Sequence, residues 1–225
     1  MMKNIIMFLA AALIAVSACQ KQVPVTKDSQ QIVYATAEAG VHSFGVTAEG
    51  GWSVTMDEDS KQWCEFLGPD YGSGMGAFSV KYDANLADGV RRGLRRQAKF
   101  TVITEDGFTS VTILFRQGGL TPHIEFKEET YTLDGNSVEN VLAINSNLSV
   151  YETPQIKYSV NGNWIYDYSL SINGVEMTIL HTANSGSAAR EAVAEISFTD
   201  CWGETFKDTA KIVQSVKQAS PEVSE

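Results

Sequence analysis

Apolar side chains recur at every second position in nearly every apolar segment of this chain, and no long segment has a helical period. Such alternation places one row of side chains on the buried face of a β-strand. Glycine-containing sequences separate the segments and predict turns: Glu49-Gly50-Gly51, Gly72-Ser73-Gly74 and Glu105-Asp106-Gly107. The expected buried positions in the first half are Phe44, Val46, Trp52, Val54, Phe78, Val80, Tyr82, Phe100, Val102, Val111, Ile113 and Phe115. About seven short strands in about 90 residues predict an immunoglobulin-like β-sandwich.

The pattern restarts at Pro122, and the second half carries the same landmarks in the same order. The expected strands lie at 124–126, 141–144, 156–159, 164–172, 175–180, 194–198 and 205–213. An Asn after a strand, an Arg-containing loop and a strand that ends in Gln recur at Asn85 and Asn184, 91–96 and Arg190, Gln117 and Gln214. Nearly equal spacing argues for a tandem repeat. We therefore expect an all-β protein with two immunoglobulin-like sandwiches, at 31–120 and 121–218, and a polar tail at 219–225.

The N-terminus has the features of a secretion signal. Lys3 precedes an apolar run at 5–16, which is too short for a membrane-spanning helix of about 20 residues. The run ends in Val16-Ser17-Ala18-Cys19, which resembles the lipobox of bacterial lipoproteins. That resemblance implies a signal peptide at 1–18, a lipid on Cys19 that binds the membrane, and a tether at 19–30. An ordinary secretory peptide that contains a cysteine is the alternative.

Several motifs of the first half resemble the BACON family (Bacteroidetes-associated carbohydrate-binding, often N-terminal). They are Gly51-Trp52-Ser53-Val54, Trp63-Cys64-Glu65-Phe66, Asn85, Arg95-Arg96 and Phe115-Arg116-Gln117-Gly118-Gly119. The second half resembles the family only at 184–214, because its beginning lacks the paired tryptophan strands. The resemblance implies a lipoprotein of the Bacteroidota with a role in glycan recognition. It also implies the outer membrane, with the periplasmic face and the cell surface both open, since no acidic cluster follows Cys19.

Composition limits the chemistry. The formal charge of −10 disfavours nucleic acid as a partner and suits a neutral ligand, or simply serves solubility. The remaining cysteines, Cys64 and Cys201, lack metal-ligand spacing; we expect a buried Cys64 and an exposed, free Cys201. The three histidines are scattered, and no nucleophile, nucleotide or zinc motif is present. We expect no enzyme activity, no cofactor and no metal site.

Aromatic and basic residues are the candidates for binding. Trp164, Tyr166 and Tyr168 alternate along one strand, so their rings should share one face; Leu170 and Ile172 continue that face, which favours burial over an exposed platform. Trp202 lies at an expected hairpin tip, where its ring contacts the other half, a ligand or partner, or nothing. Tyr71 is a similar aromatic residue in an expected loop. Arg95 and Arg96, from the one basic cluster, either bind an acidic sugar or pair with carboxylates of the chain itself.

These features predict a membrane-anchored, non-catalytic lipoprotein that binds carbohydrate or a host glycoprotein through exposed loop aromatics. The alternative is a structural spacer or an interaction subunit of a cell-surface assembly, with a surface protein as its partner.

Overall fold

The computed structural model describes residues 22–24, 29–87, 89 and 91–217. The signal peptide, Cys19 and the tail at 219–225 lie outside the described residues. Two compact units are present. Unit 1 comprises the described residues of Met1–Gln31, Gly40–Tyr82 and Phe100–Ile113, and unit 2 comprises the described residues of Ile32–Ala39, Asp83–Lys99 and Leu114–Glu225. The boundary expected between residues 120 and 121 stays a prediction.

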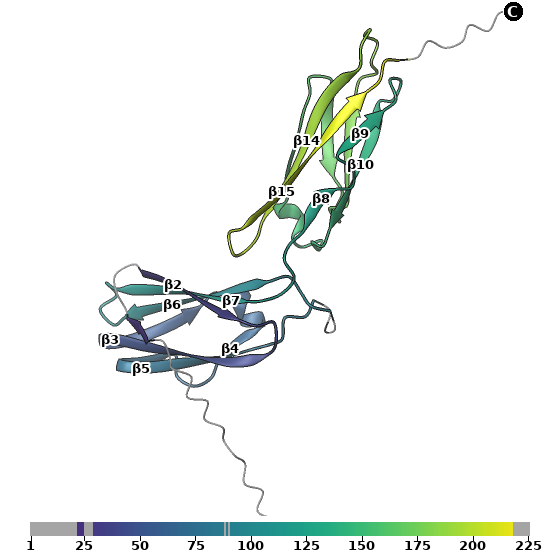
Figure 1. The fold of residues 1–225 in the computed structure, drawn as a ribbon. Coiled ribbons are helices and arrows are strands. Elements are labelled where there is room, and N and C mark those ends of the chain that lie inside the picture. Colours follow the sequence, from purple (N-terminus) through teal and green to yellow (C-terminus); the bar gives the residue numbers. More distant parts are fainter. Residues whose placement is uncertain (1–21, 25–28, 88, 90, 218–225) are drawn as a thin grey trace, which may run out of the picture. The chain divides into compact units, whose positions relative to one another are not determined.

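The protein is all-β and immunoglobulin-like, as expected (Figure 1). The strands of the first sequence half are β1 (Gln22–Pro24), β2 (Ser29–Ala35), β3 (Gly40–Met56), β4 (Cys64–Phe66), β5 (Tyr71–Tyr82), β6 (Arg96–Thr104) and β7 (Ser110–Gln117), with a short 3₁₀ helix η1 (Asp59–Gln62) before β4. They form one sheet in the order β2-β7-β6-β3-β5-β4, and β1 pairs in parallel with β3. Because β1 and the start of β2 fall within the expected tether at 19–30, part of that segment is strand.

Strand β3 is continuous through the glycines that we expected to form a turn. Its first part, 40–47, pairs with β5, and its last part, 52–56, pairs with β6. The pairing with β5 shifts register between Thr47 and Gly51, so residues 48–50 form an irregularity inside one long strand. The predicted turn at 72–74 is wrong for the same reason: these residues lie in β5, and Gly51 pairs with Ser73. The turn predicted at 105–107 is confirmed between β6 and β7.

The second sequence half forms two four-stranded sheets. Its strands are β8 (Ile124–Phe126), β9 (Thr130–Leu133), β10 (Glu139–Ser146), β11 (Lys157–Asn161), β12 (Ile165–Leu170), β13 (Glu176–His181), β14 (Arg190–Thr199) and β15 (Thr205–Gln214), with a 3₁₀ helix η2 (Thr153–Gln155) before β11. One sheet has the order β12-β13-β10-β8 and the other β11-β14-β15-β9. Strand β9 runs parallel to β15, and the other pairs in these two sheets are antiparallel. The order is that of the two sheets of an immunoglobulin constant domain, with the first strand divided between them.

The alternation identified the core correctly. All twelve positions expected to be buried in the first half are buried, and three of them form an aromatic cluster in unit 1. In that cluster the ring of Phe44 stacks on that of Phe78 at 4.8 Å, and Phe100 contacts both. The core of unit 2 is built around Leu142, Ile179, Ile196 and Ile212, each from a different strand. Leu94 also packs against this core, which accounts for the place of 83–99 in unit 2.

A buried polar cluster recurs at equivalent points of the two halves. Asn85 and Asn184 are both buried, and each donates hydrogen bonds from its amide to backbone carbonyls. The acceptors are Leu94 and Gly118 for the first, and Ala188 and Ser215 for the second. Each Asn lies near a buried Gln at the end of the last strand, Gln117 in β7 and Gln214 in β15. The landmarks that suggested a repeat are thus structural hydrogen-bonding groups.

The repeat extends further toward the N-terminus of the second half than the sequence indicated. Trp63 precedes β4, whose Cys64 pairs with Tyr82 three residues before Asn85. In the second half Trp164 precedes β12, whose first residue Ile165 pairs with His181 three residues before Asn184. Trp164 therefore occupies the place of Trp63. The second half therefore has a counterpart of one of the two tryptophans of the first half.

Candidate functional site

Arg95 is held by two carboxylates of unit 2. Its side chain is only 8% exposed; Nε donates to Asp200, and a terminal nitrogen donates to Glu204 Oε2 at 2.6 Å. Burial alone would lower the pKa of Arg95, but the hydrogen bonds to Glu204 and Asp200 outweigh it and raise the pKa. The positive charge of the guanidinium is therefore balanced by carboxylates of the protein itself, and the group is not available to an acidic sugar.

Trp202 covers this ion pair from the turn between β14 and β15. Its ring lies 4.5 Å from the guanidinium carbon of Arg95, and its Nε1 donates to the carbonyl of Arg96 at 3.2 Å. Arg116 donates to the carbonyl of Trp202 at 2.9 Å, and the ring of Tyr34 meets the indole edge-on at 5.7 Å. These partners come from the first half of the sequence and belong to unit 2. The indole of Trp202 therefore contacts other groups of the protein, which is one of the alternatives that the sequence allows.

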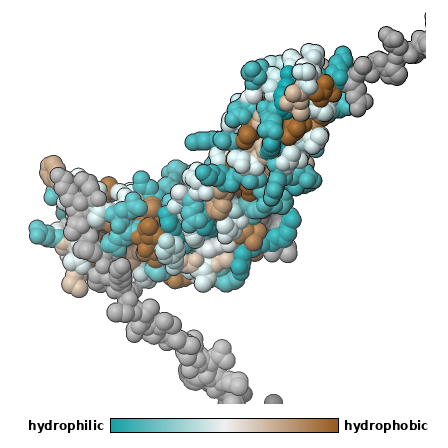
Figure 2. Space-filling view, turned by 45° about the horizontal axis from the view of Figure 1, so that its top comes forward, coloured by the Kyte–Doolittle hydropathy of each residue, from teal (hydrophilic) through white to brown (hydrophobic). Residues whose placement is uncertain are grey.

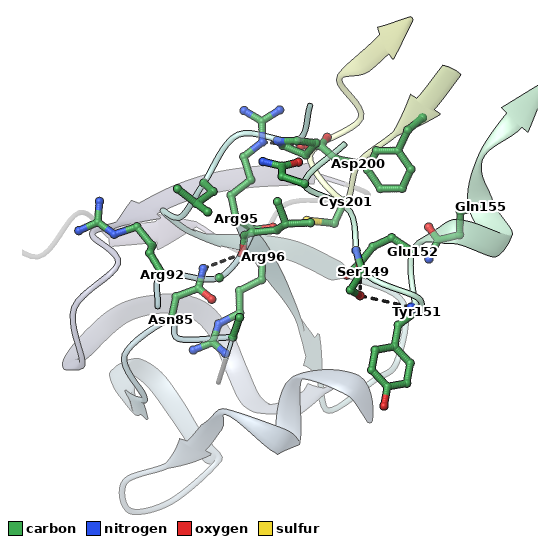
Figure 3. A pocket seen from close by; sticks show the side chains of 17 residues that line it. Asn85, Arg92, Arg95, Arg96, Ser149, Tyr151, Glu152, Gln155, Asp200 and Cys201 are labelled. Atoms are coloured by element: carbon green, nitrogen blue, oxygen red, sulfur yellow. Dashed lines mark hydrogen bonds and ion pairs between the residues drawn. The ribbon is translucent and has the colours of Figure 1, made fainter. Parts of the chain in front are cut away.

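Arg96 belongs to the polar cluster described above. Its Nε donates to Gln117 Oε1 at 2.8 Å, and its terminal nitrogen donates to the carbonyl of Asp83 at 3.0 Å. Figure 3 shows the side chains of Arg95, which precedes β6, and of Arg96, which begins it, extending to opposite sides of the backbone. Both guanidinium groups are bonded to other groups of the protein.

A cavity of about 530 Å³ lies beside this cluster within unit 2 (Figure 3). Arg92 and Asn85 line one side, and Ser149, Glu152 and Gln155 line the other. Arg92 forms an exposed ion pair with Glu38 at 3.5 Å. Glu152 caps its own turn by accepting from the backbone nitrogen of Ser149 at 2.8 Å. The polar groups of the lining are therefore largely occupied by neighbouring protein groups.

Cys64 is buried and Cys201 is exposed, as expected, and neither forms a disulfide among the described residues. The Sγ of Cys201 faces the carbonyl of Arg95 at 3.4 Å. Desolvation of the sulfur, followed by the charge of Asp200, raises the pKa of this thiol to about 11. A thiol with such a pKa is a weak nucleophile at neutral pH.

The three aromatics of the expected strand at 164–172 do not share one face. Trp164 is 6% exposed, whereas Tyr166 is 67% and Tyr168 36% exposed. The cause is a register shift in which Ile165 pairs with His181 and Asp167 with Leu180, so that Tyr166 is an extra residue in a bulge. Trp164 belongs to the core, and its Nε1 donates to the carbonyl of Glu191. Ile172, which we expected on the same buried face, is 84% exposed.

Tyr168 forms an exposed aromatic pair with Tyr158 of β11, and Tyr166 is exposed two residues before Tyr168 in β12. The rings of Tyr158 and Tyr168 meet edge-on, with centroids 6.0 Å apart and an angle of 77° between their planes. Tyr158 is 37% exposed. We call Tyr158, Tyr166 and Tyr168 the tyrosine patch. The sequence did not single out Tyr158, because it lies two positions after the buried Ile156 and alternation places both side chains on the core face. Tyr158 is exposed because β11 is the edge strand of its sheet.

The rest of the described surface carries few candidate groups for binding or catalysis. Tyr71 was expected in a loop, but it is the first residue of β5 and pairs with Ser53; its side chain is 68% exposed. The face in Figure 2 is mostly hydrophilic, with hydrophobic residues in separate areas. Among the described residues, no three His, Cys, Asp or Glu side chains gather as metal ligands. In the same residues, no helix has the length and apolar character needed to cross a membrane.

The sequence matches no model of a known family, and no curated protein is similar enough to match. Among solved structures, a Drosophila N-cadherin fragment is similar over 85% of this chain and 50% of its own, with 12% identity and a TM-score of 0.31. A Bacteroides ovatus GH5 xyloglucanase, in complex with an XXXG heptasaccharide, is similar over 64% of this chain and 28% of its own, with 18% identity and a TM-score of 0.33. A three-domain immunoglobulin fragment of titin is similar over 83% of this chain and 62% of its own, with 11% identity and a TM-score of 0.31. This chain spans about half the length of the cadherin fragment, and such distant similarity concerns architecture alone.

Proposed function

We propose that this protein is a membrane-anchored, non-catalytic lipoprotein of the Bacteroidota that binds carbohydrate through the tyrosine patch. The observation that carries the proposal is the exposed edge-on pair of Tyr158 and Tyr168 in unit 2, with the exposed Tyr166 two residues before Tyr168 in the same strand. Lipid on Cys19 would hold the protein at the outer membrane, as the lipobox resemblance implies.

Aromatic side chains suit a sugar ligand because they present a large apolar surface with a polar end at low entropic cost. The C–H faces of a sugar can pack on such a ring, while the phenol hydroxyl bonds to a sugar hydroxyl. Tyr166 supplies the most exposed of the three rings, and Tyr158 and Tyr168 supply rings that neighbouring residues hold in place. The acidic chain favours an uncharged ligand over an anionic one.

The direct test is affinity gel electrophoresis of the purified chain in gels that contain a panel of soluble polysaccharides. We expect at least one polymer to retard the protein. Replacing Tyr166 with Ala should abolish most of the retardation, and Tyr71→Ala should leave it unchanged. Tyr71 is a matched control because it is as exposed as Tyr166 but lies in unit 1. Equal binding by the Tyr166→Ala variant would contradict the proposed site.

A second candidate function is that of a spacer or interaction subunit in a cell-surface assembly. It is favoured by the finding that Arg95, Arg96 and Trp202 all contact other protein groups instead of an open surface. Cross-linking on intact cells, followed by purification of the anchored protein, distinguishes the two functions. A partner recovered reproducibly in the absence of added glycan, together with no retardation in polysaccharide gels, would favour the assembly function.

A further inference from the structure

The tyrosine patch is a corner and not a plane. Tyr158 and Tyr168 lie on β11 and β12, which are edge strands of two different sheets. Their ring planes meet at 77° with centroids 6.0 Å apart. The angle therefore follows from the way the edges of the two sheets meet in unit 2.

Packing keeps the corner in this shape. Tyr158 and Tyr168 are 37% and 36% exposed, so most of the surface of each side chain contacts protein. Ile156, two positions before Tyr158, is buried, and Leu170, two positions after Tyr168, packs against the core of unit 2, so the backbone is fixed close to each ring. Turning either ring into the plane of the other would break the contacts that bury most of its own surface. Tyr166, on the bulge of β12, is the ring with freedom to adjust.

The shape of the corner selects between physical forms of polysaccharide. A crystalline polysaccharide presents sugar faces in one flat plane, and contact with it requires several coplanar rings. Two rings at 77° cannot both lie on such a plane. A single dissolved chain is free to turn successive sugars, so that one sugar faces each ring.

The charge of the protein gives a second criterion for the ligand. Asp167 precedes Tyr168 in β12 and Lys157 precedes Tyr158 in β11, so the charges next to the two rings offset each other. The whole chain has a formal charge of −10, and this net charge would repel carboxylate or sulfate groups on a glycan, at a strength that falls with ionic strength.

We propose, on the basis of the function proposed above, that the tyrosine patch binds single chains of a neutral, soluble polysaccharide. Flat crystalline surfaces and acidic polysaccharides are excluded as ligands.

The test compares the same sugar backbone in two physical states. Hydroxyethyl cellulose, galactomannan and glycol chitin serve as soluble neutral polymers in affinity gels. Microcrystalline cellulose, crystalline mannan and chitin serve as their insoluble counterparts in sedimentation assays. We expect the full chain to bind at least one soluble polymer without sedimenting with its insoluble counterpart. Tyr158→Ala and Tyr168→Ala should each weaken binding by about tenfold, the loss of one ring contact of about 1.4 kcal/mol.

Variants that keep the rings separate binding from folding. Tyr158→Phe and Tyr168→Phe retain both rings and should bind within about twofold to threefold of the parent, since one hydrogen bond is lost at most. Sedimentation with a crystalline form, or stronger binding to carboxymethyl cellulose than to hydroxyethyl cellulose, would overturn this inference and leave the proposed function intact. Failure to bind any soluble polymer would overturn both.

Discussion

The amide oxygen of Gln214 accepts hydrogen bonds from two guanidinium nitrogens of Arg190, at 2.9 and 2.7 Å. Gln117 Oε1 accepts from Arg96 Nε at 2.8 Å in the same way. Each glutamine is fully buried, and its amide nitrogen donates to backbone carbonyls of a loop far earlier in the sequence, at Asp83 for Gln117 and at Asp134 for Gln214. One glutamine thus ties its arginine and a distant loop to the end of the last strand.

Replacement of Gln214 should therefore destabilise the protein strongly. Gln214→Leu conserves volume but leaves Arg190 and the carbonyls of Asp134 and Ser137 without their partner. We expect the free energy of unfolding to fall by about 3 kcal/mol, because buried polar groups lose their hydrogen bonds. Urea denaturation followed by tryptophan fluorescence measures this change. The control is Gln155→Leu at an exposed glutamine, which should shift the midpoint little; equal shifts would show that the cluster contributes nothing special.

The ion pair of Arg95 and Asp200 gives a second prediction. Both side chains are buried, at 8% and 3% exposure, so Arg95→Met leaves a carboxylate without its cation. We expect a loss of about 3–4 kcal/mol in the free energy of unfolding. Adding Asp200→Asn should recover part of it, because the buried charge is then removed.

A matched arginine provides the control for this cycle. Arg92 pairs with Glu38 at 3.5 Å, but both side chains are more than half exposed. Arg92→Met should cost less than about 0.5 kcal/mol. If Arg95→Met costs no more than Arg92→Met in the same denaturation assay, the pair does not stabilise unit 2.

The glycines of β5 make room for Trp52. A Cβ at Gly76 would lie 2.8 Å from the indole carbon Cζ2 of Trp52, and one at Gly72 would lie closer still. Gly76→Ala should therefore destabilise the protein by about 1–3 kcal/mol through overpacking. Gly50→Ala is the control, since nothing lies within 4 Å of its Cβ position. Thermal unfolding should show a lower Tm for Gly76→Ala alone; a similar Tm for both variants would mean that the indole shifts freely.

The pKa of Cys201 predicts a pH dependence of alkylation. With a pKa of about 11, only about one thiol in a thousand is ionised at pH 8, and the thiolate is the reactive form. In a variant with Cys19 and Cys64 replaced by Ala, iodoacetamide should react slowly at pH 8 and about tenfold faster at pH 9. Unfolding in urea should accelerate the reaction at pH 8, because the thiol then regains an ordinary pKa near 8.5. Rapid alkylation of the folded protein at pH 7 would contradict the raised pKa.

The alternation of apolar residues predicted the core because each buried position depends on its own strand. Phe78, Val80 and Tyr82 are buried exactly two residues apart, and no distant information is required. The glycines at 50–51 and 72–74 were misread because glycine permits a turn and a bulge equally well. Only the pairing of β3 with β5 decides between the two, and that pairing is a long-range contact.

The candidate site was harder to predict for a related reason. A single bulged residue in β12 changes which side chains face the core, so Trp164 is buried while Tyr166 is exposed. Nothing local in the sequence marks that bulge. Likewise, the partners of Arg95 lie more than a hundred positions along the chain at Asp200 and Glu204. The sequence provided both readings of the arginine cluster, and the fold selects the internal one.

The unbroken β3 also limits where the two halves can diverge. In the second half, residues 147–156 connect β10 to β11 across separate sheets, and this connection carries Tyr151 and Glu152 at the surface of the cavity. In the first half the corresponding residues are the irregularity at 48–50 inside β3. Insertions are tolerated in loops and rarely in paired strands. The loop of the second half can therefore accept insertions that create a binding site, whereas the paired strand of the first half cannot.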